Sequence, residues 1–252
     1  MIEVRDIYKA FNDEAVLKNV SSRFEAGKTN LIIGRSGSGK TVLMKSMVGL
    51  FEVDRGSVLY DDRDFSHMSF NERKAIRKEI GMLFQGNALF DSLTVAQNVM
   101  FPLEMFTNMT PGEMSDRVSF CLERVNLRGA NKKFPSEVSG GMQKRVALAR
   151  AIVLNPKYLF CDEPNSGLDP KTAIVIDHLI RELTLEYNMT TIINTHDMNS
   201  VMSIGDKVLF LYNGEKHWEG SSQEILHTDN KELNDFIFAS KFLEELKNTH
   251  FD

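Results

Sequence analysis

Three things are scarce or missing in this sequence. No apolar run approaches the roughly 20 residues that a membrane-spanning helix needs, and residues 1–5 do not have the pattern of a signal peptide. Only two cysteines occur, Cys121 and Cys161, and their spacing fits neither a metal site nor a redox site. Positive charge is not in excess, since the formal net charge is −5. These absences argue against a membrane span, a disulfide scaffold and a nucleic-acid partner. They favour a cytoplasmic location, and we expect both cysteines to be small residues of the core.

A glycine-rich segment is the most informative feature that is present. It has the spacing G-x-x-x-x-G-K-[ST], with Gly34, Gly39, Lys40 and Thr41 at the defining positions. Residues without a Cβ allow the turns that point successive backbone N–H groups at one anion. Lys40 is then expected to reach the terminal phosphates of a nucleotide, and the hydroxyl of Thr41 is expected to bind Mg²⁺.

A pair of acidic residues complements this loop. Asp162 and Glu163 follow the apolar residues 158–161 and precede Pro164, as at the end of a buried strand. Asp162 could hold the metal, and Glu163 could polarise an attacking water molecule. The loop and the acidic pair together predict that the chain binds and hydrolyses a nucleoside triphosphate.

Strands and helices alternate over much of the chain, which predicts an α/β fold with a mostly parallel sheet. The turn 25–28 leads into the strand before the glycine-rich loop, and Ser69 and Glu72 have the spacing of a helix capping box. Helices are expected from Gly39 toward Gly49 and over 170–187. Strands are expected over 2–8, 16–24, 57–60, 80–84, 158–162, 190–194 and 207–211.

The character of the sequence changes between residues 86 and 138, where Met and Phe recur at helical spacing between proline breaks. We therefore expect a nucleotide-binding core over 1–85 and 156–225 that includes an N-terminal antiparallel β-subdomain. A helical subdomain over 86–155 is inserted into this core, and a helical tail follows over 226–252. In the tail, Phe236, Phe238, Phe242 and Leu246 lie at helical spacing, which favours simple packing over a partner-binding element.

A third motif, Ser139-Gly140-Gly141, opens a helix that carries Lys144, Arg145 and Arg150. Alone it is a weak signal. However, it occurs in order with Gln85, the acidic pair, the segment 166–169 and the segment 195–197. With this ordered set, nearly the whole chain resembles the nucleotide-binding subunit of ATP-binding-cassette transporters, a P-loop NTPase with a RecA-like core.

The resemblance implies roles for individual residues. Phe11 is similar to the aromatic residue that stacks on adenine, Gln85 to the residue that senses the γ-phosphate and binds the metal, and His196 to the catalytic switch histidine. Alternatively, Phe11 could be an ordinary aromatic residue of an edge strand, Gln85 a solvated amide in a loop, and His196 a structural histidine. The nucleotide-binding loop would comprise Gly34, Arg35, Ser36, Gly37, Ser38, Gly39, Lys40, Thr41 and Val42.

The resemblance also implies that one chain cannot form a complete site. Ser139, Gly140 and Gly141 would bind the γ-phosphate held by a second copy of the chain, and Asp169 would cross the interface between the copies. Two chains would then enclose two ATP molecules, and hydrolysis would reopen the dimer. Met142 departs from the commonest family pattern, which has Gln at this position.

The segments 84–103 and 127–142, which include Met142, resemble the ATPase subunits of Mla/Mce-type lipid transporters. That subfamily implies a membrane permease docked near Gln85 and residues 88–93, an Mce-domain protein, in some systems a small cytoplasmic regulatory subunit, and a place on the cytoplasmic face of the inner membrane. The alternatives are the ATPase of an amino-acid or other small-solute importer and a soluble cassette that acts on ribosomes or DNA repair complexes.

Overall fold

The computed structural model describes residues 1–238, and this part of the chain divides into two compact units. The first unit consists of Met1–Glu25, Thr29–His67 and the chain from Asn194 onward. The second unit consists of Ala26–Lys28 and Met68–Ile193. The polypeptide therefore enters the second unit from the first and returns to it.

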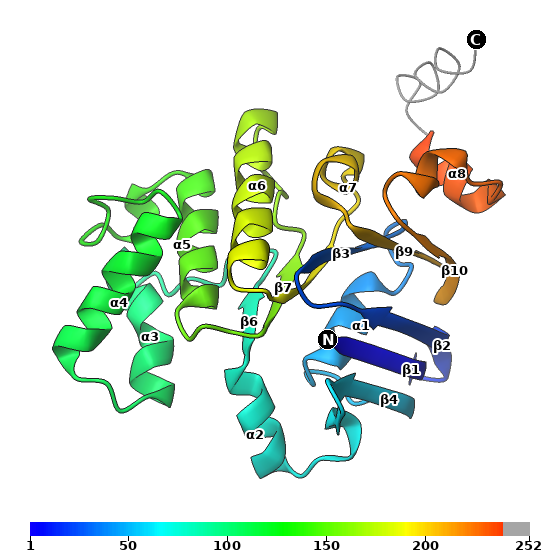
Figure 1. The fold of residues 1–252 in the computed structure, drawn as a ribbon, viewed down its shortest axis with the longest axis horizontal. Helices are drawn as coiled ribbons and strands as arrows, with labels where there is room; N and C mark the ends of the chain where they lie inside the picture. The colour runs from blue at the N-terminus through cyan, green and yellow to red at the C-terminus, as the bar shows by residue number, and fades with distance from the viewer. Residues whose placement is uncertain (239–252) are drawn as a thin grey trace. The chain divides into compact units, whose positions relative to one another are not determined.

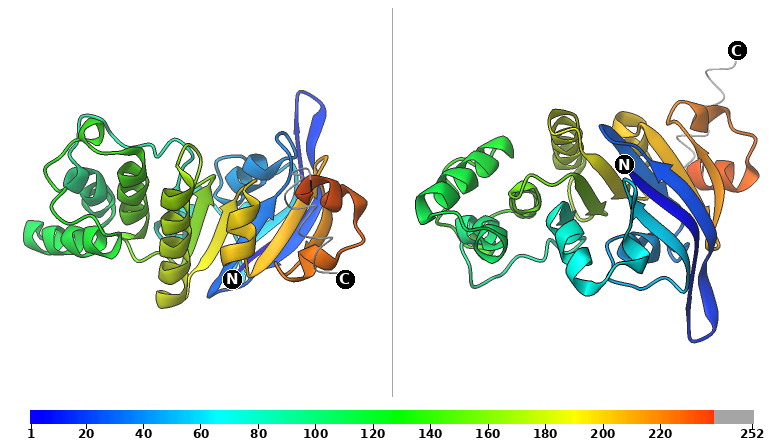
Figure 2. Two further views of the ribbon diagram at one scale, coloured as in Figure 1. Left: turned by 90° about the horizontal axis from the view of Figure 1, so that it is seen from above. Right: turned by 60° about the horizontal axis from the view of Figure 1, so that its bottom comes forward.

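An antiparallel sheet occupies one side of the first unit. Its strands lie in the order β2-β1-β4-β5. β1 and β2 form a long hairpin whose turn projects from the sheet in both views of Figure 2, and Asn12 and Asp13 at this turn have the positive φ angles of a two-residue hairpin turn. The strand limits are Ile2–Phe11 for β1, Glu14–Phe24 for β2, Arg55–Tyr60 for β4 and Arg63–Asp64 for β5.

The first unit also contains three strands in the order β10-β9-β3 (Figure 1). β3 (Lys28–Ile33) pairs parallel to β9 (Lys207–Tyr212), and β10 (Glu215–Gly220) pairs antiparallel to β9. Residues 31–33 of β3 are fully buried. The helical elements of this unit are α1 (Lys40–Met47), η1 (Phe65–His67), α7 (Met198–Ile204), η3 (Glu224–His227) and α8 (Lys231–Ile237).

The start of the predicted tail is packed. Leu233 and Ile237 of α8 are buried, and the ring of Phe236 lies 5.6 Å from the ring of Phe210 on β9. Helical spacing brings these residues to one face of α8. The predictions for Phe242 and Leu246 lie outside the described residues.

The second unit contains three strands in the order β8-β7-β6, with β6 (Ile80–Leu83) parallel to β7 (Tyr158–Asp162). β8 (Thr190–Asn194) and β7 are buried along their whole length. α3, α4 and α5 pack against one another, and α5 also contacts β6 and α6 (Figure 1). The helical elements are α2 (Phe70–Lys78), α3 (Val95–Phe106), α4 (Pro111–Arg124), η2 (Pro135–Glu137), α5 (Gly140–Ile152) and α6 (Pro170–Glu186).

The predicted α/β class is confirmed, with parallel pairs and an antiparallel sheet. The capping box of Ser69 and Glu72 is also present at the start of α2. Most expected strands occur within a few residues of their predicted limits. β10 was missed, because its polar and half-exposed residues do not give the apolar pattern of a strand. The division of the core, helical subdomain and tail at residues 85, 155 and 225 stays a prediction.

Both cysteines are buried and free, as the sequence predicted. Burial raises the pKa of the Cys121 thiol to about 11 and also raises the pKa of Cys161.

We therefore predict that iodoacetamide at about pH 8 alkylates neither thiol in the native protein and both in urea. The raised pKa also makes the free energy of unfolding depend on pH. The contribution of the neutral Cys121 thiol is complete below its ordinary pKa of about 8.5. It is lost as the pH rises toward 11, because the thiol ionises in the unfolded chain at a lower pH than in the folded protein. Rapid alkylation of the native protein would contradict this burial.

Candidate functional site

The glycine-rich loop joins the end of β3 to the start of α1 in the first unit. Gly34, Gly37 and Gly39 all have positive φ angles. Gly34 has no room for a side chain, since a Cβ there would lie 2.3 Å from the carbonyl oxygen of Leu211 and 2.6 Å from Oγ of Ser38. Gly34 is therefore required for both conformation and space, whereas at Gly37 only the conformation favours glycine.

Lys40 is folded back onto this loop. Its side chain is only 8% exposed, and Nζ donates to the carbonyl oxygens of Gly34 at 2.7 Å and Arg35 at 3.1 Å. Oγ of Ser38 is buried and has no hydrogen-bond partner in the described part of the chain. A cation, an unsatisfied hydroxyl and the N-terminus of α1 therefore lie at one short segment, which suits an anion such as a phosphate group.

Phe11 lies at the tip of the β1–β2 hairpin. It is 39% exposed, with its ring 5.3 Å from the ring of Phe51 in an edge-on contact and 5.2 Å from Nζ of Lys9. The two-residue turn fixes its register by pairing it with Glu14. A partly exposed aromatic ring at this position could stack on a planar group.

His196 follows β8 and is exposed. Its neighbours anchor the backbone, since the amide of Thr195 donates to the carbonyl oxygen of Ile32 at 3.1 Å and Oγ1 of Thr195 accepts from the amide of Asp197 at 3.0 Å. Asp197 in turn caps α7 by accepting from the amide of Asn199. The imidazole is thus carried by a segment that is held on both sides.

The acidic pair lies in the second unit at the end of β7. Asp162 is 6% exposed, whereas Glu163 is partly exposed and has a φ of 50°. A residue with a side chain in this left-handed region stores about 1–3 kcal/mol of strain, and such residues are concentrated at functional sites. The strand therefore ends with one buried carboxylate and one that is turned out of the strand direction.

Gln85 is exposed, but its backbone is held by α5. Nζ of Lys144 donates to the carbonyl oxygen of Gln85 at 2.7 Å, and the guanidinium of Arg150 donates to the carbonyl oxygens of Asn87 and Ala88, both at 2.7 Å. The sequence placed these two cations on the helix without assigning them contacts. These contacts could have been suspected from the sequence, because Lys144 and Arg150 occur among the apolar residues of the buried face of the helix, where a charged residue needs polar partners.

The Ser139-Gly140-Gly141 motif begins α5. Oγ of Ser139 accepts from the amide of Met142 at 3.3 Å and so caps the helix. Gly141 allows close approach to α6, because a Cβ there would lie 2.5 Å from Cγ2 of Thr172. At Gly140 the nearest atom would be 4.0 Å away. The unusual Met142 thus contributes a backbone amide to the cap, which any residue except proline could supply.

Asp169 caps α6 in the same way. Its carboxylate accepts from the amides of Lys171 and Thr172, both at 3.1 Å, and from the hydroxyl of Thr172. These hydrogen bonds, first the one from the Thr172 hydroxyl, hold the pKa of Asp169 below its usual value. The side chain is exposed and ionised at the start of a helix, where negative charge is favourable.

The predicted site residues are thus divided between the units. Phe11, the glycine-rich loop and His196 belong to the first, while Gln85, Asp162, Glu163, Ser139 and Asp169 belong to the second. Within residues 1–238, no three His, Cys, Asp or Glu side chains form a metal-binding group. None of the helices described there is long and apolar enough to span a bilayer.

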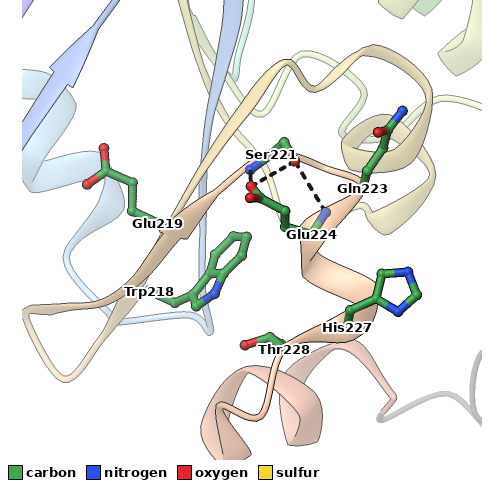
Figure 3. Close-up of a pocket in the computed structure, with 7 residues that line it drawn as sticks. All are labelled: Trp218, Glu219, Ser221, Gln223, Glu224, His227 and Thr228. Carbon is green, nitrogen blue, oxygen red and sulfur yellow. Dashed lines mark hydrogen bonds between the residues drawn. The ribbon is translucent and has the colours of Figure 1, made fainter.

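A separate open pocket of about 650 Å³ lies in the first unit beside β10 and η3 (Figure 3). Its two carboxylates are already engaged: Glu224 accepts from the amide and hydroxyl of Ser221, and Glu219 accepts from Ser22 and Lys216. None of the predicted site residues lines it. The lining residues are Trp218, Glu219, Ser221, Gln223, Glu224, His227 and Thr228.

Comparisons with known proteins identify relatives of the chain. A probable ribonucleotide transport ATP-binding protein, mkl, of Mycobacterium leprae is 37% identical over 94% of this chain, which spans 68% of that relative's length. The intermembrane phospholipid transport system ATP-binding protein MlaF of Haemophilus influenzae is also 37% identical, over 94% of this chain and 90% of its own length. The methionine import ATP-binding protein MetN of Campylobacter jejuni is 35% identical over 97% of this chain and 78% of its own.

Solved structures agree with the sequence relatives. The dimeric structure of MJ0796, a bacterial ABC transporter cassette, has a TM-score of 0.81 and 32% identity, and covers 88% of this chain and 99% of its own. A structure of the same cassette in a post-hydrolysis state, bound to ADP and Pi, has a TM-score of 0.80 and 31% identity over the same shares. The predicted P-loop NTPase fold is therefore confirmed. The sequence pattern of the family described as ABC transporter matches residues 17–166, and the chain therefore belongs to this family as an ATP-binding subunit that hydrolyses ATP.

Proposed function

We propose that this chain drives the transport of phospholipid or a similar lipid through a membrane permease, by ATP-dependent dimerisation on the cytoplasmic face of the membrane. The main support is the 37% identity to MlaF over 90% of that protein's length. The segments 84–103 and 127–142, including Met142, add to it through their resemblance to lipid-transport ATPases. By the same resemblance, an Mce-domain protein and a small regulatory subunit are the expected further partners.

Residues with proposed roles in ATP binding and hydrolysis occur in each unit. In the first, the backbone of residues 34–42 would cradle the phosphates, Lys40 would pair with the β- and γ-phosphates, Phe11 would stack on adenine, and His196 would contact the γ-phosphate. Lys40 must then exchange two carbonyl contacts for phosphate oxygens. The structure suits this exchange, because a charged donor binds anionic oxygen more strongly than neutral oxygen.

In the second unit, Glu163 would orient and deprotonate the attacking water, and Gln85 would sense the γ-phosphate. Mg²⁺ would neutralise charge on the β- and γ-phosphates, held by Thr41, Gln85 and Asp162. The hydroxyl, amide and carboxylate oxygens of these residues are the donor types that this ion prefers, and it commonly takes only one or two protein carboxylates.

Two copies would be needed for turnover. Ser139, Gly140 and Gly141 at the start of α5 would bind the γ-phosphate held by the partner copy, and Asp169 would meet that copy across the interface. The exposure of Ser139, Gly140 and Asp169 in the single chain is consistent with such a contact. Permease binding near residues 88–93 is consistent with the 42% exposure of Phe90.

An importer of a small solute is the second candidate. MetN, named for methionine import, is 35% identical over 97% of this chain, so overall similarity separates the two candidates only slightly. Because the cassette contacts phosphates and a permease rather than the cargo, the cargo has to be identified by experiment.

The cargo prediction can be tested by tagging the chain in its native cell, purifying it in mild detergent and identifying the bound proteins and lipids by mass spectrometry. We expect a permease, an Mce-domain protein and phospholipid. A permease that copurifies with a solute-binding protein would favour the importer. Recovery without any membrane protein would reject both transport assignments.

Replacing Lys40 tests the phosphate-binding role. Lys40→Ala is expected to weaken ATP binding by about 10-fold or more, because a charge-assisted contact to phosphate is worth about 1.5–3 kcal/mol. Lys45→Ala removes a cation from the same helix that contacts the ring of Phe51 instead, and should bind ATP normally. Isothermal titration calorimetry of folded variants measures both, and equal affinity of Lys40→Ala and wild type would reject the assignment.

Replacing Glu163 tests the chemical step. Glu163→Gln should lower kcat by about 10²-fold or more while ATP binding is retained, since the amide cannot accept the proton from water. The ATP-bound dimer should then accumulate in size-exclusion chromatography with ATP. The control is Glu182→Gln, which changes an exposed carboxylate on α6. Wild-type turnover by Glu163→Gln would remove Glu163 from the catalytic role.

A further inference from the structure

The segment from Gln85 to Ala88 has an unusual backbone. Asn87 and Ala88 are consecutive residues with φ angles of 61° and 50°, although neither is glycine. Ala88 has no polar side chain that could stabilise this conformation locally. Two amides form local hydrogen bonds, from Asn87 to the carbonyl oxygen of Phe84 at 2.9 Å and from Ala88 to that of Gly86 at 2.7 Å. Contacts from outside the segment must therefore contribute to holding it.

Those contacts come from α5. The ammonium of Lys144 binds the carbonyl oxygen of Gln85, and the two terminal nitrogens of Arg150 bind the carbonyl oxygens of Asn87 and Ala88, each at 2.7 Å. A weaker contact of 3.5 Å joins Nδ2 of Asn87 to Oε1 of Gln143 on the same helix. Three of the four carbonyl groups from residue 85 to residue 88 are thus bound by cations.

Neither cation forms an ion pair within the described part of the chain. Lys144 is only 2% exposed and Arg150 is partly buried. Burying a positive charge is costly unless several polar groups solvate it, and charge-assisted bonds to carbonyl oxygens are about twice as strong as neutral ones. The carbonyl oxygens therefore offset the cost of burying the two positive charges, and the cations in turn stabilise the backbone of the segment.

Lys144 also lies within electrostatic range of the acidic pair. Burial lowers the pKa of Lys144, and the charges of Asp162 and Glu163 act in the opposite direction. The ammonium group consequently connects the backbone of Gln85 with the field of the two carboxylates.

We propose that Lys144 and Arg150 are positioning residues for ATP hydrolysis: they fix the backbone from Gln85 to Ala88 and so present the side chain of Gln85. This inference rests on the proposed role of Gln85 at the metal and the γ-phosphate. Both cations belong to α5, so the position of this helix determines where the Gln85 segment is held.

Hydrogen exchange of the full-length protein tests the contact without reference to activity. In Lys144→Met and Arg150→Met, amide exchange in a peptide covering residues 84–90 should accelerate about 10-fold or more, because losing a bond to a charged group costs about 1.5 kcal/mol or more. The matched control is Arg117→Met, which removes a guanidinium on α4 that is bound to the carbonyl oxygens of Ile152 and Val153 at the C-terminal end of α5 and forms no hydrogen bond with residues 85–88. Unchanged exchange in both test variants would overturn the proposal.

Kinetics test whether the contact acts through Gln85. Lys144→Met should lower kcat by about 10- to 100-fold with little change in ATP affinity, as expected for a misplaced group rather than lost binding. The double variant Lys144→Met/Gln85→Ala should be no slower than Gln85→Ala alone. Multiplying losses in the double variant would overturn the positioning role. A wild-type rate for Glu163→Gln would instead reject the proposed catalytic site and leave the exchange result intact.

Discussion

Burial of the strands that precede the functional residues is the constraint on which the rest of this structure depends. β3 is fully buried over residues 31–33 and is followed by the loop that carries Lys40, while β7 is buried along its whole length and is followed by Glu163. A buried strand cannot slip or rotate without exposing apolar side chains, so the polar residues at its end have fixed positions. The glycines of the loop and the left-handed Glu163 then set the directions of the functional groups.

In the single chain, several side chains with proposed roles in ATP binding form hydrogen bonds within the protein. Lys40 binds carbonyl oxygens of its own loop, Ser139 caps α5, and Asp169 caps α6. Such bonds hold side chains in place and limit the conformational entropy that nucleotide binding would cost. Under the proposed mechanism, the incoming phosphates replace neutral oxygen atoms at Lys40. The helix caps at Ser139 and Asp169 place both residues at helix starts, where anions are favoured.

The motifs were predictable because each depends on residue type over a short span. The loop from Gly34 to Thr41, the acidic pair and the capping box at Ser69 all form from neighbours in sequence, so spacing alone identifies them. Long apolar strands such as β7 and β8 were equally evident. β10 was not, because its stability comes from pairing with β9 rather than from its own pattern.

The sequence by itself predicted the α/β class from its local patterns and the family from the resemblance of its ordered motifs, and it supplied the proposed nucleotide-binding residues. Glycine conformation, charge and apolar periodicity act between near neighbours, so they can be recognised in the sequence. Only the tertiary structure placed Lys144 on the carbonyl oxygen of Gln85 and Arg150 on those of Asn87 and Ala88. These partners are about sixty residues apart, with separations of 59, 62 and 63. Every residue has a backbone carbonyl group, so residue type does not show which carbonyl oxygen accepts a hydrogen bond from a distant cation. The partner of a cation on a helix is determined by how the helix packs.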